Sequence, residues 1–171
     1  MKKLFILLFL GLFLNGGVIY SIETEYKDSD LIPKKQDGKF IFGKWGFVDK
    51  AGYEVIPFKY DSVLRFESGL APAKLNGKWG FIDKSGRMVI PFQYDDVGWF
   101  FEGLARVKLG KYWKYIDKTG RIVIESTNFG YYFRYYIEAA DFVEGKAWVT
   151  IILPSGLEET YLIDKNGNEV K

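Results

Sequence analysis

Acidic side chains are the residues whose type and spacing could support chemistry in this sequence. The same motif, Asp-Lys-x-Gly, occurs four times, at Asp49, Asp83, Asp117 and Asp164. A row of aspartates at one register could bind calcium, but none of these loops contains a second carboxylate to share an ion. An Asp that opens a tight turn hydrogen-bonds the backbone N–H groups ahead of it. The motif therefore favours a structural turn at all four places.

Three glutamates recur in the same way, at a Phe-x-x-Gly corner: Glu67, Glu102 and Glu144. Paired acids are the machinery of a glycosidase, but a catalytic pair would be unique in the chain rather than repeated. The sequence has no Cys and no His, which excludes Cys nucleophiles, His-based triads, and zinc, haem and iron–sulfur sites that use those ligands. We therefore expect no enzymatic activity, no metal and no cofactor.

Aromatic residues are concentrated in the stretch 128–138, where six of the nine residues from Asn128 to Tyr136 are aromatic. Tyr, Trp and Arg are the commonest hot spots of protein interfaces. The sequence predicts a binding surface formed by Trp99, Phe100, Tyr131, Tyr132, Arg134, Tyr135 and Tyr136. The alternative is that these aromatic side chains cover one end of the domain as part of its core.

A carbohydrate or peptidoglycan ligand is the second hypothesis for the same aromatic insert, 128–138. Exposed Tyr and Trp rings can stack on sugar faces, and nearby polar groups can hydrogen-bond the hydroxyls. The candidates for that second role are Asp95, Asp96, Asn128 and Glu138. A sugar site requires two exposed, coplanar rings in a groove beside acids, whereas a protein site can be a flat patch.

These residues are carried by a repeat of about 34 residues. The clearest copy runs from Gly77 to Phe92, a near-copy runs from Trp45 to Phe58, and a weaker copy runs from Trp113 to Ile124. A fourth copy, without the tryptophan, begins near Thr160. Eight additional residues lie between Ile124 and Ala147, which places the aromatic insert inside an expanded repeat.

Each repeat reads as three short strands and two tight turns. Asn76-Gly77 predicts a type I′ hairpin, and Gly110-Lys111 predicts a type II′ hairpin at the equivalent place. Apolar residues alternate with polar ones on the first strand, as in Ala71, Ala73 and Leu75, which indicates a half-buried strand. The small Ala residues suggest close packing against the repeat tryptophan, and the Gly after Trp45 and Trp79 leaves room on the opposite face.

These patterns predict an all-β fold, an array of short antiparallel β-meander repeats that forms either an open solenoid or a partial-propeller arc. Residues 31–171 are expected to form a single domain. Its four repeats span about 31–65, 66–99, 100–141 and 142–171. Three to four repeats are few for a closed propeller, which needs about 4–8 blades.

The N-terminal segment 1–21 has the form of a secretory signal peptide. Lys2 and Lys3 precede an apolar run from Leu4 to Leu14, and small residues follow. An uncleaved anchor is the alternative, although the apolar segment is short for a membrane span. Residues 22–30 are polar and are expected to form a linker. Without 1–21, the chain has 22 basic and 22 acidic residues, so a nucleic-acid surface is not expected.

The motif Lys-Trp-Gly-Phe-Ile-Asp-Lys-x-Gly, followed by Val-Ile-Pro, Tyr-Asp and Phe-x-x-Gly-Leu-Ala, resembles the bacterial WG (KWG) repeat family over residues 31–171. The departures are Lys114 in place of Gly, Glu125 in place of Pro, and Thr160-Tyr161 in place of Trp-Gly. The resemblance implies an all-β array that is often exported and has no common enzymatic activity. We therefore expect an exported, non-catalytic module that binds protein in the periplasm, on the cell surface or outside the cell, with no stable membrane span after signal cleavage.

Overall fold

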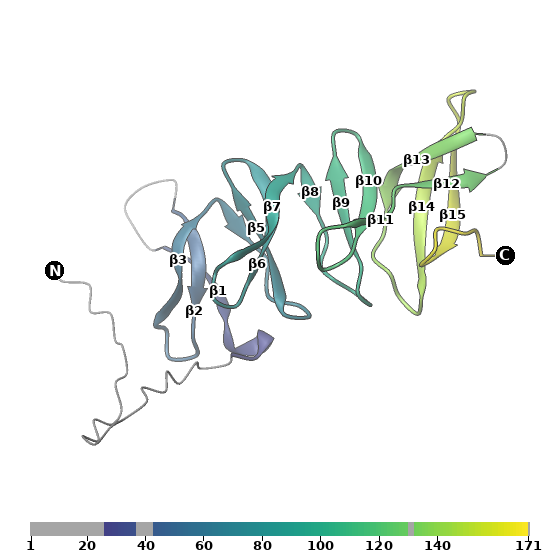
Figure 1. The fold of residues 1–171 in the computed structure, drawn as a ribbon. Coiled ribbons are helices and arrows are strands. Elements are labelled where there is room, and N and C mark those ends of the chain that lie inside the picture. The colour runs from purple at the N-terminus through teal and green to yellow at the C-terminus, as the bar shows by residue number, and fades with distance from the viewer. Residues whose placement is uncertain (1–25, 37–42, 130–131, 171) are drawn as a thin grey trace, which may run out of the picture.

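The computed structural model describes residues 26–36, 43–129 and 132–170. Antiparallel strands form a row of sheets, preceded by one short 3-10 helix, η1 (Asp28–Asp30). Figure 1 shows the sheets following one another in chain order along an elongated molecule, with β1–β3 at one end and β15 at the other. The described sheets form an open row that does not close on itself, so the predicted all-β repeat array is confirmed and its solenoid-like form is the one observed.

The first sheet has the strand order β1-β2-β3, and the second has the order β4-β5-β6-β7. The bounds are β1 (Ile32–Lys35), β2 (Trp45–Val48), β3 (Glu54–Tyr60), β4 (Ser62–Val63), β5 (Leu70–Leu75), β6 (Lys78–Asp83) and β7 (Met88–Tyr94). Because β1 pairs with β2 in the same register as β5 with β6, the degenerate first copy is a true first strand.

The third and fourth repeats share one larger sheet with the order β15-β14-β13-β10-β9-β8, to which β11 adds beside β10 and β12 beside β13. The bounds are β8 (Asp96–Val97), β9 (Ala105–Leu109), β10 (Tyr112–Ile116), β11 (Ile122–Ile124), β12 (Ser126–Phe129), β13 (Tyr132–Ala139), β14 (Lys146–Ile152) and β15 (Glu158–Asp164).

The two hairpin turns follow the local chemistry that the sequence predicts. Asn76 and Gly77 have φ values of 52° and 80°, as a type I′ turn requires at both central positions. Gly110 has φ 63°, and Lys111 does not have a positive φ, which agrees with type II′. Both hairpins are therefore fixed by residues within the turn itself.

A strand leaves each sheet and joins the next one, which links neighbouring repeats. β3 ends at Tyr60, opposite Trp45, and β4 begins two residues later and pairs with β5 of the second sheet. β7 and β8 do the same, with Tyr94 opposite Trp79. At the third junction this path is one continuous strand, β13, which pairs with both β10 and β14. Consecutive repeats therefore share backbone as well as side chains.

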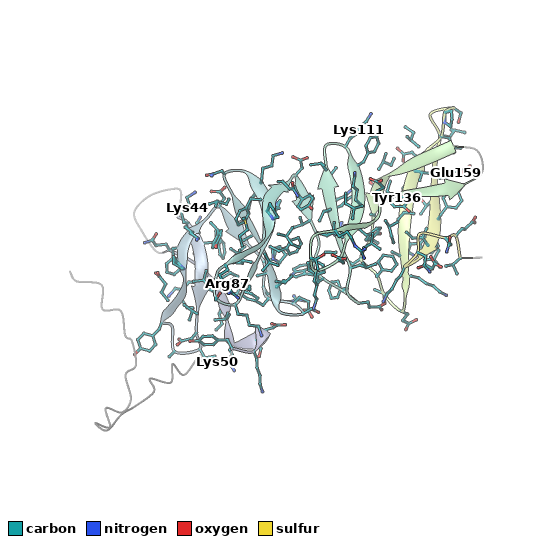
Figure 2. The ribbon with its side chains drawn as sticks, in the orientation of Figure 1. Lys44, Lys50, Arg87, Lys111, Tyr136 and Glu159 are labelled. Carbon is teal, nitrogen blue, oxygen red and sulfur yellow. The ribbon has the colours of Figure 1, made fainter. Side chains whose placement is uncertain are left out.

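An aspartate on this linking strand ties two sheets together. The Asp61 carboxylate accepts hydrogen bonds from Lys44 Nζ of the first sheet at 2.5 Å and from the backbone N–H of Gly77 of the second at 2.9 Å. The equivalent groups at the next junction are Asp95, Lys78 and Gly110. We call each of these arrangements an aspartate clamp. Figure 2 shows Lys44 at the edge of the first sheet, at the opposite end of β2 from Lys50.

A sheet with neighbours on both sides buries one face against the preceding repeat and the other against the following repeat. We call these the N-side face and the C-side face. In the second sheet the N-side face carries Ala71, Ala73 and Ile82, which pack in one cluster with Phe47 and Tyr60 of the first sheet. The apolar alternation of the sequence therefore selects the face that stacks on the previous repeat.

The same stacking occurs at the next two junctions. The second cluster joins the C-side face of the second sheet, Phe81 and Tyr94, to Ala105 and Val107 of the third repeat. The third cluster joins the third repeat to the fourth and contains Trp113, Tyr115, Ile124, Tyr136, Phe142, Ala147, Val149, Ile151 and Ile163. The core is thus three clusters in a row, one between each pair of repeats.

The repeat tryptophan does not occupy the centre of these clusters, which differs from the sequence-based expectation. The centre is filled by the aromatic residue two positions later, namely Phe47, Phe81 and Tyr115, all fully buried. Trp45 and Trp79 pack partly buried at the cluster margins, and Trp113 is buried. Large side chains two residues apart share a face of a strand, so the tryptophan extends the cluster rather than filling it.

The Gly after the tryptophan is required by a close backbone approach. A Cβ atom on Gly46 would lie 2.5 Å from the Ile56 carbonyl oxygen, and one on Gly80 would lie 2.6 Å from that of Ile90. The strand register shifts beside both glycines, and the Pro that follows each isoleucine lies in the resulting bulge, where no ladder hydrogen bond is needed from it. The predicted clearance role of Gly is confirmed.

The C-terminal end of the expected linker 22–30 forms η1, which is tied to the array. The Asp28 carboxylate accepts a hydrogen bond from the N–H of Gly69 at 3.0 Å and pairs with Lys84 Nζ at 3.1 Å. Asp30 pairs with Lys50 Nζ at 2.6 Å. The acidic composition that suggests a solvated linker instead supplies partners for the first two repeats.

The predicted signal peptide, 1–21, lies outside the described residues. Within the described ranges, no helix combines the length and the apolar composition that crossing a membrane demands.

Candidate functional site

Trp99 lies partly exposed between the second and third repeats. Its indole Nε1 donates a hydrogen bond to the Arg65 carbonyl oxygen at 3.3 Å, and the Arg65 guanidinium lies 5.0 Å from the centre of a Trp99 ring. The ring of Phe101 lies 6.4 Å away. This predicted site residue is therefore at the surface, where it also bridges two repeats.

Phe100 does not belong to a binding surface, and its inclusion there is a correction. It is 1% exposed, and its ring lies 4.9 Å from that of Phe81. Phe66 holds the same position against Phe47 in the preceding cluster, at 4.8 Å. The spacing of 34 residues between Phe66 and Phe100 is the sequence signal that marks Phe100 as part of the repeat.

Tyr136 is also core rather than surface. It is fully buried in the third cluster, where it pairs with Trp113 on β10 as Tyr94 pairs with Trp79. Figure 2 shows the residue inside the fold, among the strands of the third and fourth repeats. Burial raises the pKa of its hydroxyl well above the usual range, so the group is neutral. The alternative hypothesis, that aromatic side chains of the insert form core, therefore holds for this residue.

The remaining predicted residues lie on or beside one hairpin. Tyr132, Arg134 and Tyr135 belong to β13, where the structure describes their backbone alone, and Tyr131 lies outside the described residues. β12 pairs with β13 from Ser126 opposite Tyr135 to Phe129 opposite Tyr132. We call this hairpin, residues 126–135, the arm. In Figure 1 it reaches past β14 and β15 at the C-terminal end of the row.

The arm replaces the bulge that ends the third strand in the first two repeats. Three residues separate Ile90 from Tyr94, whereas eleven separate Ile124 from Tyr136. Ile124 still pairs with Tyr115, as Ile90 pairs with Phe81. The eight additional residues therefore leave the array and return to it between two positions that keep their places in the repeat.

Two departures from the repeat motif anchor this arrangement. Lys114 stands where the first two repeats have the Gly that permits the close backbone approach, and Glu125 stands where they have Pro. The Lys114 Nζ lies 2.9 Å from the Glu125 carboxylate, and the Lys114 side chain is mostly buried. The two substitutions are thus partners, and together they mark the base of the arm.

Of the polar residues proposed to bond a sugar, Asn128 lies on β12 in the arm and Glu138 lies on β13 beyond it, whereas Asp95 and Asp96 lie between the second and third repeats. Asp95 belongs to an aspartate clamp, and its pKa is lowered by the hydrogen bond from Lys78 and then by that from Gly110. Asp96 accepts a hydrogen bond from the N–H of Val97 at 2.8 Å. Asp96 and Glu138 occupy equivalent places on β8 and β13, one repeat apart.

The four Asp-Lys-x-Gly aspartates have the predicted turn role. Oδ1 of Asp83 accepts the N–H groups of Ser85 and Arg87 at 2.9 and 3.0 Å. The same two bonds, from two and four residues ahead, are made at Asp49, Asp117 and Asp164. Burial raises the pKa of Asp83, but the bonds from Ser85 and Arg87 outweigh it and lower the value. In the described part of the chain, no three acidic residues are grouped so that they could hold a metal ion.

Glu102 joins two repeats. Its carboxylate lies 2.8 Å from Lys165 Nζ and accepts the N–H of Gly145 at 2.9 Å. The hydrogen bond from Lys165 is the main reason that the Glu102 pKa is lowered, whereas a general acid needs a raised pKa. Glu67 lies 3.7 Å from Arg65 Nε in its own repeat. The repeated glutamates are therefore corner residues.

Two comparisons, one with curated proteins and one with solved structures, returned no match for this chain. A family model described as "WG containing repeat" matches it twice in succession, over residues 45–79 and 79–113. These two segments run from one repeat tryptophan to the next, in step with the sheets of the structure. The chain therefore contains two adjacent WG repeats, within residues 45–113.

Proposed function

We propose that this chain is an exported, non-catalytic module that binds another protein through the arm. The observation that carries the proposal is the exchange of a three-residue bulge for a projecting hairpin between Ile124 and Tyr136. This exchange does not alter the core packing of the repeat, because Tyr136 still occupies the position of Tyr60 and Tyr94. An elaboration that leaves the core unchanged is best explained by recognition.

Export is supported by the sequence of 1–21, with its basic start and apolar run, and by the match to a family that is often exported. The periplasm, the cell surface and the extracellular medium all fit this reasoning. A core built from apolar clusters and hydrogen-bonded turns, in a chain that has no cysteine, needs no disulfide in any of these compartments.

A protein partner is favoured by the chemistry of the arm. A two-stranded antiparallel ribbon presents backbone N–H and C=O groups along its edges, which can pair with an extended segment of another chain. Its sequence adds tyrosines and one arginine, the residue types that most often dominate protein interfaces. Peptidoglycan or another carbohydrate is the competing ligand for the same arm.

The test removes the arm and restores the geometry of the second repeat. In this variant Pro-Phe-Gln, the sequence between Ile90 and Tyr94, replaces residues 125–135, and Lys114→Gly restores the close approach. A second variant keeps the arm but changes its tyrosines, Tyr131, Tyr132 and Tyr135, to Ser. The matched control is Tyr53→Ser, at an exposed tyrosine of the first repeat.

Capture from envelope extracts and sedimentation with purified peptidoglycan are measured for all four chains, together with thermal unfolding. We expect the full chain and Tyr53→Ser to retain one protein partner that both arm variants lose while remaining folded. Retention of that partner by the folded armless variant would rule out the arm as the interface. Loss of peptidoglycan binding alone would replace the protein hypothesis with the carbohydrate one.

A further inference from the structure

The stacking of repeats leaves one sheet face without a neighbour among the described residues. Ala147, Val149 and Ile151 of β14 are buried on the N-side face of the fourth repeat. The alternate residues of β14 therefore form its C-side face, where Trp148 is 58% and Ile152 is 47% exposed. This is the C-terminal end of the row in Figure 1.

Earlier repeats cover the position that Trp148 occupies. The equivalent residue is Pro72 in the second repeat, which is buried, and Arg106 in the third. Arg106 Nε lies 2.8 Å from the Asp141 carboxylate, and its Nη1 donates to the Ala139 carbonyl oxygen at 3.1 Å. Pro72 is thus buried, and the Arg106 side chain is held by the strand that links the third repeat to the fourth. Trp148 is therefore a large apolar residue at a position built to contact another repeat.

The rim of this face also carries an acidic side chain that has no partner among the described residues. Glu144 occupies the corner position of Glu102, and both have left-handed φ values, 52° and 50°. The Glu102 carboxylate pairs with Lys165, the turn lysine of the next repeat. The Glu144 carboxylate has no hydrogen bond or ion pair to any residue in the described ranges.

Lysines of the Asp-Lys-x-Gly turns reach the preceding corner throughout the row. Lys84 pairs with Asp28, Lys118 Nζ donates to the Ser68 carbonyl oxygen at 2.7 Å, and Lys165 pairs with Glu102. The turn lysine of the first repeat is Lys50, at the other end of the row. Its side chain is 68% exposed, and it pairs with Asp30 of η1.

We propose that a second copy of this chain docks head to tail, with its β1–β3 sheet on the C-side face of β14 and β15. Lys50 of one copy then meets Glu144 of the other, as Lys165 meets Glu102 within the chain. Ile32, exposed on β1 in the register of Ala71, packs toward Trp148. The proposed contact uses no residue of the arm, which reaches the same end of the row.

Charge complementarity supports this occupant. The first sheet offers Lys34, Lys50 and Glu54, and the C-terminal end offers Glu144, Glu158 and Lys146, all of them exposed, so that opposite charges are available on both surfaces. The mature chain has no net charge to oppose self-association. Because the two surfaces differ, the contact is heterologous, and each docked copy presents a new free end. Association therefore produces open chains of copies whose length increases with concentration.

The experiment measures sedimentation velocity of the purified full chain over a range of concentrations. The variants are Trp148→Ser, Glu144→Lys and Lys50→Glu, with Met88→Ser, an exposed apolar residue in the middle of the row, as the matched control. We expect the wild type and the control to form species larger than dimers, and Trp148→Ser to weaken association by about tenfold or more.

Each charge reversal alone is expected to weaken association, and an equimolar mixture of Glu144→Lys and Lys50→Glu is expected to restore it, because every junction between one variant and the other again joins opposite charges. Circular dichroism verifies that each variant is folded. A wild-type chain that stays monomeric at all concentrations would overturn the proposal. So would association that ignores Trp148, or a mixture that fails to recover.

Discussion

Tyr115 and Tyr136 show how one hydrogen bond distinguishes two buried residues of the same type. Their rings lie 6.2 Å apart in the third cluster, and both are fully buried. The Tyr115 hydroxyl donates to the Ala140 carbonyl oxygen at 2.7 Å, whereas the Tyr136 hydroxyl has no partner among the described residues. Burial raises the pKa of both hydroxyls, so neither is charged near neutral pH.

The matched substitutions Tyr115→Phe and Tyr136→Phe should therefore have opposite effects on stability. Tyr115→Phe removes the hydrogen bond to the Ala140 carbonyl oxygen and should lower the free energy of unfolding by about 1 kcal/mol. Tyr136→Phe removes a buried hydroxyl that has no partner, so it should be neutral or stabilising by about 1 kcal/mol. Urea unfolding measures both, and an equal loss in the two variants would contradict this assignment of the hydrogen bond.

At the residue scale, sequence predicted what short-range chemistry decides. Asn76-Gly77 and the turn aspartates form their bonds within a few residues, and their roles were correct. Phe100 and Tyr136 were misassigned because burial depends on a partner in another repeat. The register of the repeat would have identified both, since Phe66 and Tyr94 hold the same positions.

The aspartate clamps operate at the scale of elements, since each joins two sheets through one carboxylate. At Asp95 the hydrogen bond from Lys78, followed by the one from Gly110, lowers the folded-state pKa. Such a group stabilises the fold above its unfolded pKa, about 4. This contribution is lost as the pH falls through the lower folded-state value.

Asp95→Asn should therefore lower the free energy of unfolding at neutral pH. It should also make that free energy change less as the pH falls into the acid range. We expect the urea midpoint of the variant to fall less than that of wild type between about pH 6 and about pH 3. Asp96→Asn is the matched control for removing a neighbouring carboxylate outside the clamp. Parallel acid profiles for Asp95→Asn and wild type would show that the clamp does not contribute.

The arm is the element that the sequence located only in part. The eight additional residues and their aromatic content were evident, and so were Lys114 and Glu125 as departures from the motif. The ion pair between Lys114 and Glu125 was not evident from the sequence, because it depends on how closely two strands approach. That distance is set by the replacement of Gly with Lys on the facing strand. The spacing of residues along the sequence does not reveal a side-chain contact between two strands.

The whole molecule is a row in which each core cluster belongs to two repeats. Stability in such arrays is close to a sum of terms between nearest neighbours. Ile151 lies in the last cluster and Ile90 in the middle one, and both are fully buried. A defect at the end of the row should therefore remain local, whereas a defect in the middle should affect both sides.

We expect Ile151→Ala and Ile90→Ala each to lower the local free energy of unfolding by about 2–5 kcal/mol. The two variants should differ in how many strands are destabilised. Hydrogen exchange should accelerate in β14 and β15 of Ile151→Ala and stay slow in β5 and β6. In Ile90→Ala it should accelerate on both sides of the second cluster. Uniform acceleration in both variants would mean that the row unfolds as one cooperative unit.

The segment that forms a bulge in the first two repeats and the arm in the third can differ in length and sequence between repeats. Both ends of that segment are held by strand pairing, Ile124 to Tyr115 and Tyr136 to Trp113, so its contents are free to vary while the core stays fixed. The first and second repeats have the same two fixed ends, closed over a Gly. Each of these repeats can therefore accept an inserted hairpin at this position. New binding loops can be added along one edge of the row without changes to the core.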